Sequence, residues 1–190
     1  MRVMLRRITA GAAVVAGVGV SVVGGPVSAH AAMAPCGYGG ITVKADGTGM
    51  WGTKRPGQWA RHGAWIHNAT KVKYGQAVFN LLIPQVNPWG VHLRGPAPSV
   101  GWRIGHSGAW HTAKVTSHPK GDGPYAFWDT GDIRTWSLSA GQSRYLDVRM
   151  SFHKGNNAAI YMSLLELGAV QCAGGADLLG MDDLYFSYKL

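Results

Sequence analysis

Residues 135–152 read TWSLSAGQSRYLDVRMSF and contain the clearest structural pattern in the chain. Apolar residues occupy every second position of 146–152, which is the period of a β-strand with one buried face and one wet face. Val148 is therefore expected to be buried and Arg149 to be exposed. A turn at 140–143 joins this strand to a second, shorter alternation upstream. Two strands at a tight corner predict a two-layer β architecture.

The rest of the chain also favours β structure, because its 28 glycines and nine prolines interrupt it every few residues. No stretch of 12 residues has the sustained apolar spacing of a helix. Residues 78–83 have few polar positions on either face, which predicts a central strand that ends at Pro84. Residues 85–123 are expected to form long loops around two or three short strands. The predicted strands are 40–45, 49–52, 61–68, 76–84, 100–103, 113–117, 125–129, 133–138, 143–153, 158–169 and 184–190.

The first 32 residues are predicted to be a cleaved signal peptide. Three arginines among the first seven residues precede an apolar, glycine-rich run at 10–23, and small residues follow at the positions that a signal peptidase reads. The apolar run is too short for a transmembrane helix. We expect cleavage after Ala31 or Ala32, secretion without a stable membrane anchor, and one β-sandwich domain over residues 33–190.

The charge of the secreted part is moderately basic. Without the three leader arginines, 15 lysines and arginines face nine acidic residues, a net charge of +6. No run of five or six like charges occurs, which argues against a nucleic-acid partner. Two interpretations stay open: attraction to anionic cell-wall polymers, and a surface charge that only maintains solubility.

Cys36 and Cys172 are the only cysteines and lie near the two ends of the secreted part. An even cysteine count in an exported chain predicts a disulfide, and two unpaired buried thiols are the alternative. A bridge between them would close a loop of more than 100 residues and connect the first segment to a late strand.

Residues suited to catalysis are few. Glu166 is the only glutamate, and a glycosidase needs two facing carboxylates. Asp129 and Asp132 flank a glycine, where turn capping explains them. Ser107 lies in GHSG, which does not match the G-x-S-x-G pattern of serine hydrolases. We therefore predict no catalytic residues.

No metal or other cofactor is predicted. The histidine pairs His62/His67 and His106/His111 are each five residues apart, without the H-E-x-x-H spacing of a zinc site. A spacing of five in a strand also places the two side chains on opposite faces.

The chain is rich in tryptophan, with eight residues, and their positions are informative. Trp65 and Trp136 are in phase with predicted strands and are expected in the core. Trp89, Trp102 and Trp110 lie in the glycine- and proline-rich middle, with Arg103 nearby. Aromatic faces beside hydrogen-bonding side chains can stack on sugar rings, so these four residues are the candidate ligand-binding residues. The alternative is that the tryptophans only pack the loops against the sandwich.

The sequence WIHNAT at 65–70, the apolar run at 78–83 and the LSAGQ corner at 138–142 resemble bacterial immunoglobulin-like domains. In those domains an Asn-x-Thr turn joins two core strands, and an L-x-A-G corner precedes a late strand. The resemblance covers residues 60–165 and implies an immunoglobulin-like two-sheet sandwich. The chain also resembles small secreted actinobacterial proteins. The resemblance to immunoglobulin-like domains implies a module without catalytic activity.

Three functions follow as expectations. The first is a secreted, non-catalytic binding or structural module outside the cell or in the cell envelope. The second is a carbohydrate-binding module that uses the loop tryptophans, and the third is a small secreted hydrolase. The expected partner is a cell-wall or extracellular polysaccharide, or another secreted protein.

Overall fold

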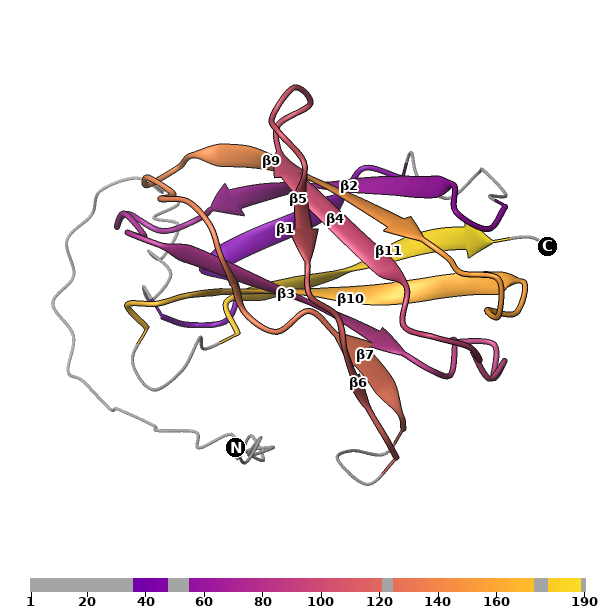
Figure 1. The fold of residues 1–190 in the computed structure, drawn as a ribbon. Helices are drawn as coiled ribbons and strands as arrows, with labels where there is room; N and C mark the ends of the chain where they lie inside the picture. The colour runs from indigo at the N-terminus through magenta and orange to yellow at the C-terminus, as the bar shows by residue number, and fades with distance from the viewer. Residues whose placement is uncertain (1–35, 48–54, 121–124, 173–177, 189–190) are drawn as a thin grey trace, which may run out of the picture. The chain divides into compact units, whose positions relative to one another are not determined.

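The computed structural model describes residues 36–47, 55–120, 125–172 and 178–188 (Figure 1). Over these ranges the chain is all-β, as predicted, and none of the described residues forms a helix that could span a membrane. The eleven strands are β1 (Ile41–Ala45), β2 (Trp59–Asn68), β3 (Ala77–Pro84), β4 (Ser99–Ile104), β5 (His111–Ala113), β6 (Thr116–His118), β7 (Phe127–Asp129), β8 (Ile133–Arg134), β9 (Ser143–Ser151), β10 (Ala159–Ala169) and β11 (Gly180–Tyr188).

The strands form two antiparallel sheets. The five-stranded sheet has the order β1-β2-β9-β4-β5, and the six-stranded sheet has the order β11-β10-β3-β7-β6, with β8 also paired to β3. In immunoglobulin nomenclature, β1, β2, β9 and β4 take the places of strands A, B, E and D, and β3, β10 and β11 those of C, F and G. The predicted immunoglobulin-like sandwich is confirmed. β7 and then β6 continue the second sheet beyond β3, the C strand. Both follow β4, the D strand, in the sequence.

The core lies between the two sheets, and β9 shows why. Leu146, Val148 and Met150 point inward and are fully buried, as the alternation predicted. The expectation for the other face of β9 is wrong. Asp147 is only 1% exposed, and Arg149 is half-buried under two tryptophans.

β3 is the central strand of its sheet, as its apolar run predicted. It pairs with β10 on one side and with β7 and β8 on the other, and it ends at Pro84. The middle of the chain holds β4, β5 and β6 within long connections. The strand predicted at 113–117 is instead two strands, because the chain passes there from one sheet to the other. The strand predicted at 133–138 is reduced to β8, and the one at 49–52 lies outside the described residues.

Asn68 joins the two sequence patterns that suggested the fold. Its Oδ1 accepts hydrogen bonds from the backbone N–H and the hydroxyl of Thr70, at 2.9 and 2.7 Å. Its Nδ2 donates to the carbonyls of Val72, Leu138 and Ser139, at 2.7, 3.1 and 3.0 Å. Asn68 is fully buried, so these bonds satisfy an amide that would otherwise be costly to bury. The Asn-x-Thr turn and the LSAGQ corner therefore form one hydrogen-bonded unit.

Tyr161 forms a second fixed corner, between β9 and β10. Its ring is fully buried, and its hydroxyl donates to the carbonyl of Asn157, four residues upstream, at 3.0 Å. A tyrosine near the start of strand F that bonds back to the backbone is the tyrosine corner of immunoglobulin-like sandwiches.

Cys36 and Cys172 lie at disulfide distance, as predicted, with their Cα atoms 5.3 Å apart. Cys36 precedes β1 in one sheet and Cys172 follows β10 in the other, so the link connects the two layers. The predicted signal peptide, residues 1–32, lies outside the described residues.

Candidate functional site

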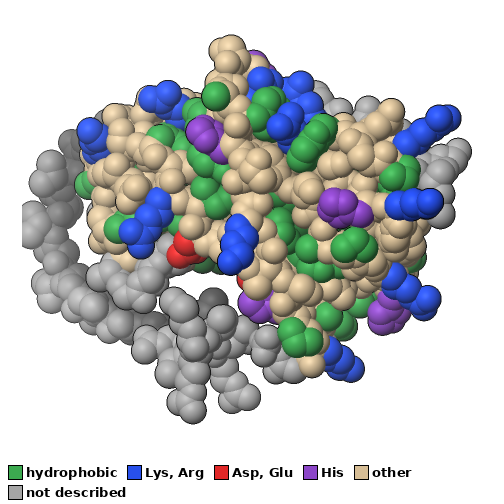
Figure 2. Space-filling model, in the orientation of Figure 1, with side chains coloured by type: hydrophobic (Ala, Val, Ile, Leu, Met, Phe, Trp, Pro, Cys, Tyr) green, Lys and Arg blue, Asp and Glu red, His purple; other side chains and the backbone are tan. Residues whose placement is uncertain are grey.

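The outer face of the five-stranded sheet combines arginines with aromatic side chains. Alternate residues of a strand share a face, so the outward positions of β2, β4 and β9 meet on this side. Figure 2 shows Lys and Arg side chains gathered beside hydrophobic ones near the β4–β5 loop, at the top of the view. We call the following set the Arg–Trp face: Trp59, Arg61, Trp65, Arg103, Trp110, Tyr145, Asp147 and Arg149.

Asp147 is the centre of this face. Arg103 holds its carboxylate through Nε at 2.9 Å and Nη2 at 2.8 Å. Arg61 adds a short contact from Nη2 to Oδ2 and a 3.4 Å bond from Nε to Oδ1. Because Asp147 is buried, removing either arginine would leave a desolvated charge with fewer partners. The hydrogen bond to Asp147 is also the main reason that the pKa of Arg61 is raised.

Trp110 lies over the three arginines. The guanidinium carbons of Arg149, Arg103 and Arg61 are 4.2, 4.5 and 5.5 Å from the Trp110 ring centroids. Arg149 is also 4.2 Å from the ring of Trp59, so its guanidinium contacts two indoles. Such cation–π contacts stabilise by about 0.5–2 kcal/mol each. Burial lowers the pKa of Arg149, and the nearby charges of Arg103 and Arg61 lower it further.

Two strand glycines provide the space for this arrangement. A Cβ at Gly63 would lie 1.9 Å from the hydroxyl oxygen of Tyr145, which crosses β2 at that point. A Cβ at Gly101 would lie 2.8 Å from Nε of Arg149, which crosses β4. Glycine in a strand allows this close approach at the expense of a side chain that could pack. Tyr145 and Arg149 can therefore lie flat on the sheet.

Tyr145 connects the face to Asp46 and His62. Its hydroxyl donates a short hydrogen bond to Asp46 Oδ2, and burial followed by this bond raises its pKa. The other carboxylate oxygen of Asp46 is 3.9 Å from Nε2 of His62, which is buried on the inner side of β2. On the outer side, the Tyr145 ring lies 4.1 Å from the His106 ring and 5.2 Å from the Trp65 ring.

A hollow of about 370 Å³ opens on this face. Two exposed indoles of β2 lie on the same face, Trp59 at 37% and Trp65 at 48% exposure. They are six residues apart, about 20 Å along a strand. The arrangement offers flat apolar platforms at two points, with hydrogen-bond donors near them. The residues that line the hollow are Asp46, Arg61, His62, Gly63, His106, Tyr145 and Asp147.

The predicted ligand-binding residues are only partly brought together. Arg103 and Trp110 belong to the Arg–Trp face. Trp102 instead points between the sheets, where its ring is 5.4 Å from Phe79 and stacks on His111 at 4.5 Å. Trp89 lies in the β3–β4 loop at 62% exposure.

The assignment of Trp65 to the core is wrong. Trp65 points outward because Ala64 and Ile66, its neighbours in β2, take the buried positions. Trp136 packs partly buried against the core, as expected.

The sequence patterns did not predict that five further residues belong to one site: Trp59, Arg61, Tyr145, Asp147 and Arg149. A signal for them was present, since Gly63 and Gly101 interrupt predicted strands, and an isolated strand glycine indicates close approach of another group. That signal identifies the position of the contact but not the side chain that makes it.

The residues considered for catalysis lie on separate elements. Ser107 is exposed in the β4–β5 loop. Asp129, in β7, accepts a hydrogen bond from the Gly131 N–H at 2.9 Å, the turn capping expected of it, and lies 2.9 Å from Nε2 of His118. Within the described ranges, no group of three or more His, Cys, Asp or Glu residues is placed to hold a metal ion.

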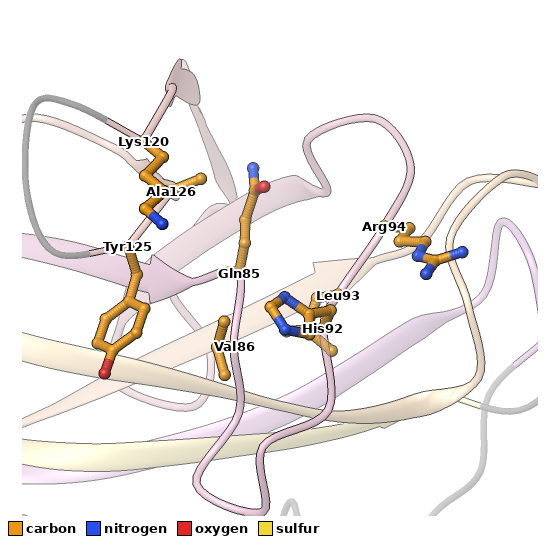
Figure 3. A pocket seen from close by; sticks show the side chains of 8 residues that line it. All are labelled: Gln85, Val86, His92, Leu93, Arg94, Lys120, Tyr125 and Ala126. Carbon is orange, nitrogen blue, oxygen red and sulfur yellow. The ribbon is translucent and has the colours of Figure 1, made fainter.

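A second concavity of about 520 Å³ lies between the β3–β4 loop and the residues that precede β7 (Figure 3). In Figure 3, Tyr125 and Lys120 approach from one side and Val86 and His92 from the other. Most of its lining side chains are exposed or half-exposed, so it is an open depression. Its lining residues are Gln85, Val86, His92, Leu93, Arg94, Lys120, Tyr125 and Ala126.

No protein-family model matches the chain, and no curated protein matches its sequence. Solved structures do match its fold. AvmM, described as catalysing macrocyclization in alchivemycin A biosynthesis, is 11% identical, with a TM-score of 0.57 over 80% of this chain and 90% of its own.

Two further structures are less similar. The ASH/PapD-like domain of human CEP192 is 12% identical, with a TM-score of 0.36 over 91% of this chain and 96% of its own. The CARDB domain of a Pyrococcus furiosus protein, solved with di-metal ions, is 8% identical, with a TM-score of 0.34 over 78% of this chain and 85% of its own. The likeness to AvmM supports the β-sandwich fold, and at such low identity none of these structures transfers an activity.

Proposed function

We propose that this protein is a secreted, non-catalytic module that binds an extracellular or cell-envelope polysaccharide through its Arg–Trp face. The observation that supports this most directly is the pair of exposed indoles, Trp59 and Trp65, on one sheet face with the hollow that Arg61 lines. The apolar face of a sugar ring stacks on an indole, while its hydroxyls need donors and acceptors at the rim.

The spacing of the two indoles favours an extended polymer over a small molecule. A pocket that encloses a small ligand buries most of its surface. Here the platforms are about 20 Å apart along β2, and a chain of sugar units can contact both. Secretion, with cleavage after Ala31 or Ala32, is part of the proposal, and N-terminal sequencing of the protein recovered from the culture medium tests it.

Retention on insoluble polysaccharides, followed by intrinsic tryptophan fluorescence, tests the binding function. Trp59→Ala and Trp65→Ala should each weaken binding about three- to tenfold, the loss of one stacking contact. Trp89→Ala is the matched control, since it removes an exposed indole from the β3–β4 loop. If only Trp89→Ala reduces retention, the binding site is in that loop. If no polysaccharide retains the wild-type protein, the proposal is wrong.

A further inference from the structure

We propose that the Arg–Trp face selects an acidic polysaccharide, one whose sugar units bear carboxylates. This inference rests on the proposed function and defines the ligand of the same site. Its basis is the excess of guanidinium groups over carboxylates on a face that also has aromatic platforms.

The charged side chains on the outer face of the five-stranded sheet are mostly basic. Among the described residues of β1, β2, β4 and β9, the outward Lys and Arg side chains are Lys44, Arg61, Arg103 and Arg149. The only outward acidic side chain on these strands is Asp147, which is buried beneath two of the arginines. Asp46, at the end of β1, accepts the Tyr145 hydroxyl and lies near His62. The face thus presents more positive than negative charge to a ligand.

Arginine crowding makes an incoming anion favourable. Arg61, Arg103 and Arg149 all lie within 5.5 Å of the Trp110 ring, with one carboxylate between two of them. The lowered pKa of Arg149 reflects its burial and the repulsion from the other two. A bound carboxylate would offset this repulsion, because opposite charges attract strongly where water is partly excluded.

Arg61 is the residue placed to reach that anion. Its side chain is 53% exposed, whereas that of Arg103 is 13% exposed. Asp147 engages Nε and Nη2 of Arg61, and a guanidinium has five N–H donors, so the Nη1 side is available. The contact with Asp147 also shows that this guanidinium accommodates a carboxylate.

Spacing favours a carboxylate attached to a sugar ring over a phosphate between rings. Trp59 and Arg61 are two residues apart on β2, about 7 Å. A uronate unit has its ring and its carboxylate together, so the ring can contact an indole while its acid contacts Arg61. A phosphodiester polymer separates the charge from the ring.

The test compares polygalacturonate, its methyl ester and poly(glycerol phosphate), with affinity measured by tryptophan fluorescence of the full secreted protein. Polygalacturonate should bind at least about tenfold tighter than its methyl ester, and the difference should shrink as salt is raised. Arg61→Ala should weaken polygalacturonate binding about tenfold, and Arg61→Lys less. Arg144→Ala, which removes an exposed charge from the same strand as Asp147, should change it less than about twofold. Melting curves verify that each variant is folded.

Each other outcome is informative. Equal binding of the methyl ester overturns the inference and leaves the proposed function standing. Tighter binding of the phosphate polymer, or equal losses for Arg61→Ala and Arg144→Ala, also overturns it. If none of these polymers and no insoluble polysaccharide binds, both the inference and the proposed function are wrong.

Discussion

Gly63 is the residue on which the flat packing of Tyr145 depends. A methyl group there would lie 1.9 Å from the Tyr145 hydroxyl oxygen, so Gly63→Ala must displace the ring and break its bond to Asp46. We expect a loss of about 1–3 kcal/mol in the free energy of unfolding, measured by urea denaturation. Gly75→Ala is the control, because its Cβ would meet only Gln171 Oε1, at an ordinary 3.5 Å. Equal stability of the two variants would show that Tyr145 moves without loss.

His62 should make stability depend on pH. Burial lowers its pKa below the ordinary value of 6.5 and outweighs the backbone hydrogen bond with Tyr185 and the attraction of Asp46, which both raise the pKa. Its Nδ1 lies 2.8 Å from the Tyr185 amide nitrogen and 3.2 Å from the Tyr185 carbonyl oxygen, so burial of the ring, and not this contact, sets the direction of the pKa shift. The folded state therefore binds a proton more weakly than the unfolded state. Stability is fully present above pH 6.5 and should fall as the pH drops through 6.5 toward the lowered pKa.

Denaturant titrations at a series of pH values between about 7 and 5 measure this effect. His62→Gln should flatten the dependence, whereas His67→Gln, on the outer side of β2, should keep the full slope. If the free energy of unfolding of His62→Gln varied with pH as steeply as that of the wild type, other groups would cause the pH dependence.

At the scale of an element, β9 has two buried faces of different kinds. Val148→Asp would place a charge in the apolar core and should cost more than about 3 kcal/mol. Arg149→Asp would lose contacts with Trp59 and Trp110 and place a second carboxylate beside Asp147, so we expect a loss of about 1–3 kcal/mol. Arg144→Asp, at an exposed position, should stay within about 0.5 kcal/mol. If Arg149→Asp and Arg144→Asp had the same melting temperature, the stacking of Arg149 on the two indoles would be contradicted.

The alternation in β9 was sufficient to predict a strand and the identity of its inner face. It could not show that the outer face is covered, because Arg61 and Arg103 cover Asp147 from β2 and β4, and Arg149 is covered by Trp110. That residue reaches the face from the β4–β5 loop, about 40 residues away in the sequence. Periodicity reports the neighbours along a strand, whereas the burial of Asp147 depends on arginine side chains from the two neighbouring strands of the sheet.

β2 shows a different limit of sequence interpretation. The outward face of its sequence WARHGAWIHN has tryptophan, arginine and histidine side chains around Gly63, whereas the inward face has Ala60, Ala64 and Ile66 together with the polar His62 and Asn68. Hydrophobicity alone favours Trp65 as a core residue. The structure instead places Ala60, Ala64 and Ile66 inside and leaves Trp65 48% exposed on the outer face. The buried face of β2 therefore follows Ala60, Ala64 and Ile66, and a hydropathy pattern that counts Trp65 as apolar assigns that residue to the wrong face.

At the scale of the whole sandwich, three ties hold the layers in register. Asn68 joins the β2–β3 turn to the corner before β9, and Tyr161 fixes the corner between β9 and β10. The link between Cys36 and Cys172 then connects the first segment of one sheet to the end of β10 in the other. The hydrogen-bonded ties act locally, whereas the cysteine link restricts nearly the whole described chain.

Reduction of the Cys36–Cys172 link should therefore lower the melting temperature substantially. The cysteines are 136 residues apart, and closing such a loop restricts the unfolded chain by about 4–5 kcal/mol in the chain-entropy model. At about 2–4 °C per kcal/mol, a decrease of roughly 10 °C or more follows. Since the effect acts mainly on the unfolded state, the β-type circular dichroism at room temperature should persist after reduction.

The double variant Cys36→Ala/Cys172→Ala is the control for this prediction, because its melting temperature should equal that of the reduced protein and should not respond to reductant. Thiol titration of the denatured, unreduced protein should detect no free sulfhydryl. Two free thiols would show that the link does not form in the isolated protein. A reduced protein that melts at the same temperature as the oxidised one would show that the unfolded chain gains little freedom when the loop opens.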